Sequence, residues 1–363
     1  MNKLELRFPN GATPVFIGEN IFLQLPRLLK KQNAAANVFI VIDAKVKRRY
    51  ADLISAVASE LVRCEIFAIK ADEKNKSFEG LSKIFARMLK KNFGRDTTLI
   101  AIGGGVIGDL AGFAAATFAR GIKLVQVPTT LLAMVDSSIG GKTGINFGEV
   151  KNIVGAFYRP EFILTDVAFA QSLSRDDLIS GLGEIVKYGF LADEKFFGYV
   201  EKNLERFLSK EKSVLKKAVL ESAKVKISVV QQDEKEAGLR KILNLGHTFA
   251  HAFESASDYK LSHGKAVMLG IYAAIHLGVR LEITNENLAE RYLEFISKLK
   301  KDFPKISFDE KTAYSVMLND KKNRDGKIKF VLPINFGELA LDVEAPKKEV
   351  FRALREVNGF LMQ

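Results

Sequence analysis

The sequence has almost no cysteine and no tryptophan. Its 363 residues include one cysteine, Cys64, and only four histidines. A single cysteine excludes an intrachain disulfide, and this usage fits a reducing compartment. Because residues 63–67 have the pattern of the start of a strand, we interpret Cys64 as a buried, unreactive thiol rather than a nucleophile.

Targeting and membrane signals are also missing. Residues 1–7 alternate charged with apolar side chains and contain no apolar core of a signal peptide. No apolar run approaches the length of a membrane span. We therefore expect a cytoplasmic protein without a membrane partner.

Acidic residues are fewer than basic ones, 43 against 55, which gives a net charge of +12. Such an excess is typical of proteins with an anionic partner, either nucleic acid or a small phosphorylated substrate, but also of a lysine-rich surface. The lysines lie mostly on helical stretches such as 210–217 and 298–305, mixed with acids. No basic stripe is interleaved with aromatic residues, so we expect no nucleic-acid partner.

The order of apolar runs predicts two domains. In the first half, short apolar strands alternate with helical stretches such as 51–61 and 78–91. This alternation predicts an α/β, Rossmann-like domain with a parallel sheet over residues 1–170. The candidate strands are Val38–Asp43, Glu65–Lys70, Thr98–Gly103 and Lys123–Val127.

After about residue 170 the pattern becomes helical. Ser174 begins a capping-box sequence that opens a helix, and no strand is expected before Lys327–Leu332 and Leu339–Leu341. We therefore predict an all-α, or mainly helical, metal- and substrate-binding domain over residues 171–363. Its further helices are expected at 195–208, 212–232, 246–256, 264–282 and 286–300.

A glycine-rich turn follows the third candidate strand. Residues 103–108 satisfy G-x-G-x-x-G and open a helix of small residues. Glycines let the backbone approach a pyrophosphate, and a helix N-terminus adds free N–H groups and a positive dipole end. The position after the third strand, with no acidic strand end about 20 residues later, disfavours a standard Rossmann dehydrogenase. A tight turn without a ligand remains an alternative.

A second small-residue segment carries a lysine. Thr129 and Thr130 stand at a strand end, where open α/β sheets bind ligands, and the glycine-rich stretch 135–146 contains Lys142. Asp136 occupies the place of the leading glycine of a P-loop, so a loop that binds a nucleoside triphosphate is disfavoured. The pattern indicates a loop around an anion, with a flexible surface loop as the alternative.

The few histidines are clustered. His247 and His251 are spaced i,i+4 on one helix face, and His263 opens the next helix. Glu184 lies on an earlier helix among apolar residues, where an unpaired carboxylate is costly. Two histidines and one carboxylate with open positions are typical of a catalytic zinc-type site.

Other interpretations of these residues remain open. Glu184 would also be satisfied by Lys187 or Lys226, and His247 would also cap a helix. His276 stands in an apolar helix and is expected to pack there. The cations Lys187, Lys226, Arg240, Lys321 and Lys322 suit a substrate that carries both phosphate and carboxylate.

Together these motifs resemble the 3-dehydroquinate synthase family over almost the full length. The resembling segments are Gly103–Asp109, 120–121, Gln126–Leu132, Asp136–Asn146, Lys151–Tyr158, Ser180–Gly189, Asp233–His251, 263–264 and 320–322. Two positions depart from the family pattern. Residues 71–75 differ from its usual acidic-glycine stretch, which weakens the role of Glu73, and Lys265 stands where the family usually has Glu.

The resemblance implies a carbon–oxygen lyase of the shikimate route to chorismate and the aromatic amino acids. It would convert 3-deoxy-D-arabino-heptulosonate 7-phosphate, a phosphorylated sugar acid, into 3-dehydroquinate and phosphate. The implied steps are transient oxidation by NAD, phosphate elimination, reduction and intramolecular aldol closure. The resemblance also implies a homodimer. Glu236 and His251 would be the proton-transfer candidates, although the substrate phosphate is an alternative base.

The resemblance implies three sets of residues. Zinc or cobalt would be bound by Glu184, His247 and His263. NAD would be bound by Asp43, Glu73, Lys76, Gly104, Gly105, Val106, Ile107, Gly108, Asp109, Thr129, Thr130, Lys142, Lys151, Phe169, Ala170, Gln171 and Ser172. The substrate would meet Arg120, Asp136, Lys142, Asn152, Lys187, Lys226, Arg240, Asn244, His251 and either Lys321 or Lys322.

Two related functions remain as alternatives. One is another sugar-phosphate cyclase that acts on a neutral or amino sugar phosphate; Arg240 and Asn244 favour a substrate with a carboxylate instead. The other is an NAD- and metal-dependent polyol dehydrogenase, which would accumulate NADH.

Overall fold

The computed structural model describes residues 1–9, 11–148, 150–236, 238–258, 260–319 and 327–362. The chain forms two compact units. The first comprises Met1–Leu173 with Lys210–Gln231, and the second comprises Ser174–Ser209 with Gln232–Gln363. The division at residue 170 stays a prediction, and the structure adds that Lys210–Gln231 packs with the first unit. Among the described residues, no helix has both the length and the apolar composition that crossing a membrane requires.

The first unit contains a seven-stranded sheet in the order β1-β2-β9-β6-β5-β3-β4. All neighbouring strands are parallel except β1 and β2, which pair antiparallel. The strands are β1 (Asn2–Phe8), β2 (Gly11–Gly18), β3 (Asn37–Asp43), β4 (Cys64–Ile69), β5 (Thr97–Gly103), β6 (Lys123–Pro128) and β9 (Phe162–Asp166). The parallel-sheet prediction is therefore confirmed, and the four candidate strands correspond to β3–β6.

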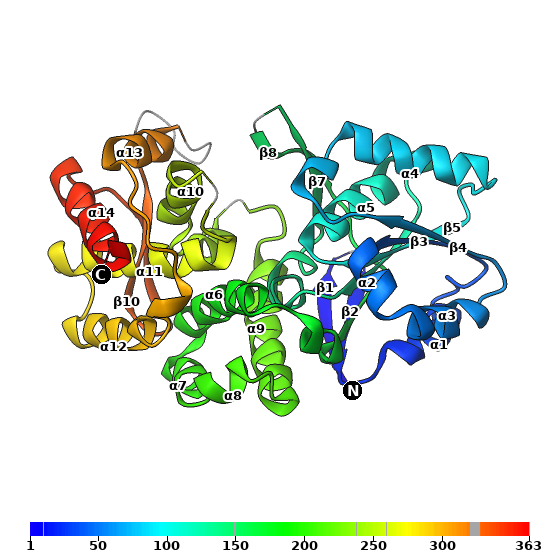
Figure 1. Cartoon of the computed structure of the whole chain (residues 1–363), viewed down its shortest axis with the longest axis horizontal. Helices are drawn as coiled ribbons and strands as arrows, with labels where there is room; N and C mark the ends of the chain where they lie inside the picture. Colours follow the sequence, from blue (N-terminus) through cyan, green and yellow to red (C-terminus); the bar gives the residue numbers. More distant parts are fainter. Residues whose placement is uncertain (10, 149, 237, 259, 320–326, 363) are drawn as a thin grey trace. The chain divides into compact units, whose positions relative to one another are not determined.

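Helices cover this sheet and a separate hairpin packs beside it (Figure 1). The helices are α1 (Leu25–Lys31), α2 (Ala44–Arg49), α3 (Ala51–Ser59), α4 (Phe78–Lys90), α5 (Gly105–Thr117) and α9 (Lys212–Gln232), and the hairpin is β7 (Lys142–Phe147) with β8 (Val150–Phe157). On α4 the apolar residues Leu81, Ile84 and Met88 follow helical spacing and enter a core with Leu110 of α5 and Leu99 of β5. The segment 135–146, which we expected to be a loop, thus begins in a short helical turn (Ala133–Ser137) and ends in strand β7, which contacts α5.

The second unit is mainly helical, as predicted, with one two-stranded antiparallel sheet. Its helices are α6 (Arg175–Ala192), α7 (Glu194–Lys202), α8 (Leu204–Leu208), α10 (His247–Ala256), α11 (His263–Arg280), α12 (Glu286–Ser297), α13 (Glu310–Leu318) and α14 (Lys347–Met362), and its strands are β10 (Phe330–Asn335) and β11 (Glu338–Val343). Strands β10 and β11 overlap the two strands that were expected, so the unit is mainly helical rather than all-α. Helices α13 and α14 were not predicted individually.

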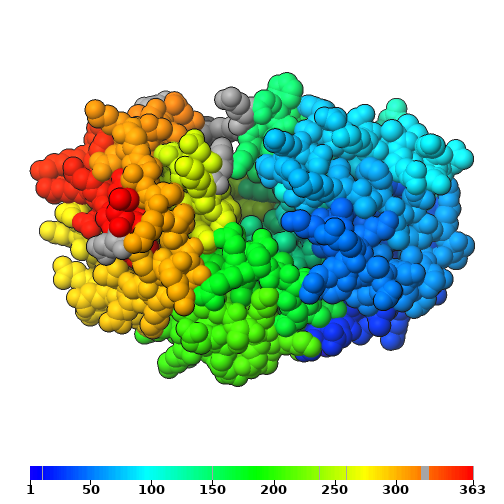
Figure 2. Space-filling model, in the orientation of Figure 1, coloured from blue at the N-terminus to red at the C-terminus, as the bar shows by residue number. Residues whose placement is uncertain are grey.

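Helix α11 is the centre of the second unit. It contacts α6, α10, α12, α14 and β10, and most of its residues are buried. A helix that is apolar on nearly all sides is stable only inside such a bundle. By contrast, α14 is apolar on one side only, and the space-filling view shows it in red at the surface of this unit (Figure 2). The position of α11 matters for function because its first residue is His263.

Candidate functional site

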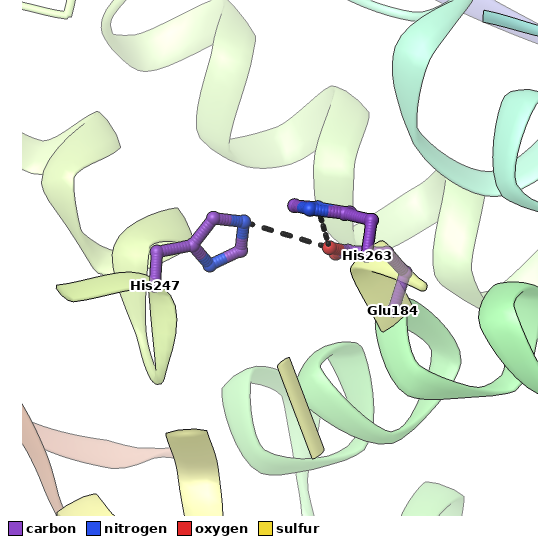
Figure 3. Close-up of side chains that lie close together, drawn as sticks. All are labelled: Glu184, His247 and His263. Atoms are coloured by element: carbon purple, nitrogen blue, oxygen red, sulfur yellow. Dashed lines mark ion pairs between the residues drawn. The ribbon is translucent and has the colours of Figure 1, made fainter. Parts of the chain in front are cut away.

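Three predicted metal ligands come together in the second unit. Glu184 lies on α6 with no exposed surface, and His247 and His263 are the first residues of α10 and α11. The Nε2 atom of His247 lies 3.5 Å from Glu184 Oε1, and that of His263 lies 3.3 Å from the same oxygen. Figure 3 shows both rings directed at the Glu184 carboxylate. One ligand atom from each residue falls within 4.8 Å of the others.

Glycines bring these helices into backbone contact. A Cβ atom on Gly183 would lie 2.0 Å from the carbonyl oxygen of Gly264, and a Cβ on Gly264 would lie 1.7 Å from that of Ser180. Any larger residue at either position would separate α6 from α11. The two glycines stand directly beside Glu184 and His263, so their contact determines how closely these two side chains meet.

A second glycine pair positions His247. Gly246 precedes α10 with a φ of +77°, a left-handed conformation that glycine adopts without steric cost. A Cβ on Gly270 of α11 would lie only 2.1 Å from the carbonyl oxygen of Gly246. The start of α10 therefore rests on the backbone of α11, and His247 begins its helix at that point.

The second nitrogen of each ring also has an acceptor beside it. His247 Nδ1 lies 3.2 Å from the carbonyl oxygen of Leu245, and His263 Nδ1 lies 3.5 Å from Glu254 Oε2. An acceptor at Nδ1 holds the proton there and leaves the Nε2 lone pair for a cation. Two imidazole nitrogens and one carboxylate oxygen facing one point fit a zinc-type ion.

The electrostatics of His263 agree with this geometry. Burial alone would lower the pKa of the ring. Hydrogen bonds to Glu184 and Glu254 outweigh this effect and raise the pKa of His263 to about 10. Without a metal ion the ring of His263 would therefore carry protons on both nitrogens, and an ion that binds at Nε2 would replace one of them.

Lys187 shares the Glu184 carboxylate. Its Nζ lies 2.5 Å from Glu184 Oε2, and its side chain is 2% exposed. The sequence left open whether Glu184 pairs with Lys187 or with the histidines, and the structure shows both. The lysine contacts Oε2, while the histidines face Oε1. Lys226 does not take part, since its Nζ lies 2.7 Å from Asp136 Oδ1 in the first unit.

Further predicted substrate residues lie near this cluster along the second unit. The ring of His251 is 5.6 Å from that of His247, one turn along α10. Arg240 is buried in the 3₁₀ turn Leu239–Asn244, where its guanidinium donates to the carbonyl of Glu234. Asn244 donates to Glu236 Oε1 at 3.3 Å. Lys321 and Lys322 lie outside the described residues, so their roles stay predictions.

The glycine turn of the first unit is tightly packed. Gly103 ends β5, and Gly104 caps the N-terminus of α5. A Cβ on Gly104 would lie 2.9 Å from Thr130 Cγ2, and a Cβ on Gly108 would lie 3.0 Å from Gln126 Oε1. The N-terminus of α5 thus opens at the carboxyl end of a parallel strand, where α/β sheets bind ligands. Val106 and Ile107 occupy the first turn of α5.

Lys76 joins this turn to the hairpin. Its Nζ lies 2.5 Å from Asp109 Oδ2 and also donates to the side chain of Asn152. Its carbonyl accepts from the backbone of Asn146, whose side-chain amide donates to Glu73. Burial raises the pKa of Asp109, against the opposing charge of Lys76. Lys76 therefore connects α5 with the β7–β8 hairpin, in addition to its predicted contact with the cofactor.

The remaining predicted residues of the first unit lie at strand and helix ends. Asp43 ends β3 and caps α2 by accepting from the backbone of Lys45 at 3.0 Å. Arg120 is exposed, with a φ of +65°. Others are Thr129 after β6, Lys142 at the start of β7, Lys151 in β8, and Phe169, Ala170, Gln171 and Ser172 in the 3₁₀ turn Val167–Ser172. The roles of these residues in binding NAD or the substrate stay predictions.

The sequence interpretation missed the residues that orient the site. Glu254 follows His247 and His251 at the spacing i, i+4, i+7, which places all three on one face of α10. The glycines at 183, 246 and 264 each adjoin a predicted ligand. Both patterns are visible in the sequence once the three ligands are known.

An α/β unit with a glycine turn and a mainly helical unit form the two-domain fold of solved sugar-phosphate cyclases and, more distantly, of solved alcohol dehydrogenases. The fold is similar to that of a 2-deoxy-scyllo-inosose synthase complexed with carbaglucose-6-phosphate, NAD⁺ and Co²⁺ (TM-score 0.90, 23% identity, 98% and 100% of the two chains). It is also similar to the 2-epi-5-epi-valiolone synthase of Streptomyces hygroscopicus subsp. jinggangensis 5008 with NAD⁺ and Zn²⁺ (TM-score 0.87, 26% identity, 96% and 97%). An iron-containing alcohol dehydrogenase of Thermotoga maritima is more distant (TM-score 0.68, 16% identity, 96% and 98%).

The sequence comparisons are more specific. Residues 66–180 match the 3-dehydroquinate synthase N-terminal family and residues 181–323 match the C-terminal one. The 3-dehydroquinate synthase of Alkaliphilus metalliredigens is 38% identical over 93% of this chain and 94% of its own length. That of Acetivibrio thermocellus is 36% identical over 98% and 100%. The chain belongs to the 3-dehydroquinate synthase family.

Proposed function

We propose that this chain converts 3-deoxy-D-arabino-heptulosonate 7-phosphate into 3-dehydroquinate and phosphate, as a carbon–oxygen lyase of the shikimate route. Family membership over almost the whole chain supports the reaction. The observation that carries the proposal is the cluster of Glu184, His247 and His263, whose donor atoms converge as a catalytic metal site requires.

Zinc or cobalt would be held by these three side chains. The ion would supply Lewis-acid polarisation of substrate hydroxyl oxygens. Glu184 offers Oε1 to this position, while Lys187 holds Oε2 and so fixes the orientation of the carboxylate. The solved 2-epi-5-epi-valiolone synthase contains Zn²⁺, which supports the same kind of site here.

NAD would lie at the glycine turn. It would supply a hydride acceptor that is restored within each turnover. The free backbone N–H groups at the start of α5 face the carboxyl edge of the sheet and suit a pyrophosphate. Glycines at 104 and 108 let the side chains of Thr130 and Gln126 pack against this turn, since a Cβ at either position would lie about 3 Å from them. The remaining contacts are those that the family resemblance implies, from Asp43 to Ser172.

The cations of the chain would bind the substrate. Lys187 lies beside the metal cluster and is held by Glu184, so its ammonium has a fixed position. Lys226 is fixed in the same way by Asp136, and Arg240 is buried where its backbone N–H donates to Asp233. Charges that are held in place bind phosphate and carboxylate groups without further ordering, which favours a substrate bearing both.

Proton transfer would fall to residues close to the metal cluster. The ring of His251 stands one helical turn from that of His247 and is the nearest further imidazole on α10. Glu236 accepts from Asn244 and is the second candidate. If the substrate phosphate is its own base, both residues take supporting roles in orienting the substrate.

The test is a phosphate-release assay. Purified protein with the proposed substrate, trace NAD and Zn²⁺ should release phosphate at a rate that continues well beyond one equivalent of NAD, without accumulation of NADH. Phosphate release that stops when NADH reaches one equivalent would contradict the proposal, and so would no release at all. Glycerol and neutral sugar phosphates, assayed in parallel, distinguish the two alternative functions.

A substitution of one proposed metal ligand sharpens this test. His247→Ala should lose bound metal by elemental analysis and lose phosphate release, while its circular dichroism spectrum stays that of the wild type. Full metal retention would contradict the ligand role.

We also propose that the protein is a cytoplasmic homodimer, in keeping with the family resemblance. Size-exclusion chromatography with light scattering tests the dimer, and an elution mass of one chain would refute it.

A further inference from the structure

We propose that Glu254 is a positioning residue of the metal site, acting through His263. This inference rests on the metal site of the proposed function. Glu254 Oε2 lies 3.5 Å from His263 Nδ1, and the glutamate side chain is only 13% exposed. Its effect would be to fix the proton of His263 on Nδ1 and to hold the plane of the ring.

The helix geometry explains why this carboxylate reaches that histidine. His247 and Glu254 are seven residues apart on α10, which is two helical turns, so both lie on the same face. That face packs against α11, because Gly246 and Gly270 let the two helices meet at backbone distance. Helix α10 therefore supplies one ligand directly and also the carboxylate that orients a ligand from α11.

The contact of Glu254 with His263 matters because of the chemistry of the imidazole ring. A neutral histidine carries one ring proton, and the nitrogen without it is the one that binds a metal. His263 Nε2 faces Glu184 Oε1, whereas Nδ1 faces Glu254. An ionised carboxylate accepts and never donates, so Glu254 holds the proton on Nδ1 and raises the basicity of Nε2.

The two histidines differ in how they are oriented. His247 Nδ1 faces the carbonyl oxygen of Leu245, a main-chain acceptor that no substitution removes. His263 Nδ1 faces a side chain, which a substitution can change. Removing the carboxylate should therefore weaken the site through His263 alone and leave His247 oriented.

The experiment compares Glu254→Gln and Glu254→Ala with the wild type. Zn²⁺ affinity of the metal-free protein is measured by competition with a chelating dye, and the environment of the ion by the visible spectrum of the Co²⁺ form. Loss of an orienting partner typically weakens metal affinity by about 10–100-fold. We expect a loss in this range for Glu254→Ala and a smaller one for Glu254→Gln, whose amide oxygen still accepts a hydrogen bond. We also expect an altered Co²⁺ spectrum for Glu254→Ala.

Glu290→Gln is the matched control, since Glu290 is exposed on α12. It should leave Zn²⁺ affinity and the Co²⁺ spectrum unchanged. Metal affinity of both Glu254 variants within twofold of the wild type, with an unchanged Co²⁺ spectrum, would overturn the proposal. If Glu254→Ala does not fold, Glu254→Gln alone decides in the same way.

The measurements need no substrate, so this inference and the proposed function fail differently. If the wild-type protein binds Zn²⁺ and the Glu254 variants match it, only the role of Glu254 is refuted. If the wild-type protein binds no Zn²⁺, both the metal site and the role of Glu254 are refuted. Long-range nitrogen–proton NMR of the Zn²⁺ form supplies an independent result, because the ring proton of His263 should reside on Nδ1.

Discussion

Replacing Gly183 by alanine should remove the metal while the protein remains folded. The added Cβ would lie 2.0 Å from the carbonyl oxygen of Gly264 and 2.7 Å from its Cα. Non-bonded carbon atoms prefer separations of about 3.5–4.0 Å, so α6 and α11 would have to move apart by roughly 1 Å or more. Glu184 and His263 are the neighbours of these glycines and would move with their helices.

The substitution should lower the free energy of unfolding only slightly but lower Zn²⁺ affinity strongly. Overpacking costs about 1–3 kcal/mol, and alanine in place of a helical glycine returns about 1 kcal/mol, so the net loss of unfolding free energy should stay within about 2 kcal/mol. Metal–ligand distances, however, tolerate only about 0.2 Å. We therefore expect Zn²⁺ affinity to fall by at least about 10–100-fold, as it does when a ligand loses its orientation.

The assay measures Zn²⁺ affinity by dye competition and unfolding by circular dichroism in urea. Gly359→Ala is the matched control, because Gly359 is also helical but a Cβ there meets nothing within 4 Å. It should keep full metal affinity and gain about 0.5–1 kcal/mol of stability. A Gly183→Ala protein with wild-type Zn²⁺ affinity would refute the claim that the glycine contact sets the distance between the ligands.

Three further predictions concern ionisable side chains outside the metal cluster. Burial raises the pKa of Cys64 to about 11. Iodoacetamide at pH 8 should thus alkylate the folded protein at least about 100-fold more slowly than the urea-unfolded one, whose thiol has a pKa of about 8.5; equal rates would contradict this. Lys76→Met removes the partner of the mostly buried Asp109 and should cost about 1–3 kcal/mol of unfolding free energy. The cost should be greater at pH 8 than at pH 5, because the unpaired Asp109 would have a raised pKa and bind a proton on acidification; a pH-independent loss would argue against the ion pair. Lys265→Glu, which puts the usual family residue beside Asp176, should lose about 0.5–1 kcal/mol, and a second change, Asp176→Lys, should restore it. A double-mutant cycle in urea measures this coupling, and a value of zero would refute the pairing.

The strands that were predicted, β3 to β6, are rich in Val, Ile, Leu or Phe, although β4 is only partly buried. β3, β5 and β6 are almost entirely buried, so their sequences show this pattern. β1 and β2 were not expected, because charged residues interrupt β1 and two glycines and a proline interrupt β2, and β9 has only five residues. The pairing of β2 with β9 joins residues almost 150 positions apart, and such a neighbour relation depends on tertiary packing rather than on local sequence.

The hairpin shows a different reason for a missed element. Residues 135–146 are rich in glycine and polar side chains, which predicts a loop. In the structure, a Cβ on Gly112 of α5 would lie 2.4 Å from Thr143 Cγ2, so β7 packs closely on a helix that leaves room for it. Gly144, which weakens the local strand pattern, allows a second close contact, since a Cβ there would lie 2.7 Å from the carbonyl oxygen of Val154 in β8.

The metal ligands were predictable because their chemistry is rare. Four histidines in the chain, three of them within 17 residues, stand out in any reading of the sequence. Glu254 does not, because a single glutamate on a helix resembles an ordinary surface charge. The spacing from His247 places Glu254 on the same helix face, but its role depends on the distance to His263, which follows from the packing of α10 on α11.

The sharing of Glu184 has a consequence for what the site can bind. The carboxylate is fully buried, and Lys187 already neutralises its charge through Oε2. The two histidines must be neutral to act as ligands. A divalent ion bound at Oε1 would therefore have one further carboxylate close by, that of Glu254 behind His263, so about one of its two positive charges would stay uncompensated. In a buried setting such charge is costly unless an anion accompanies it, so the site would favour a negatively charged substrate over a neutral polyol. This electrostatic preference follows from one lysine on the same helix as the ligand, and it points to the phosphorylated sugar acid rather than to the alcohols of the dehydrogenases that share the fold.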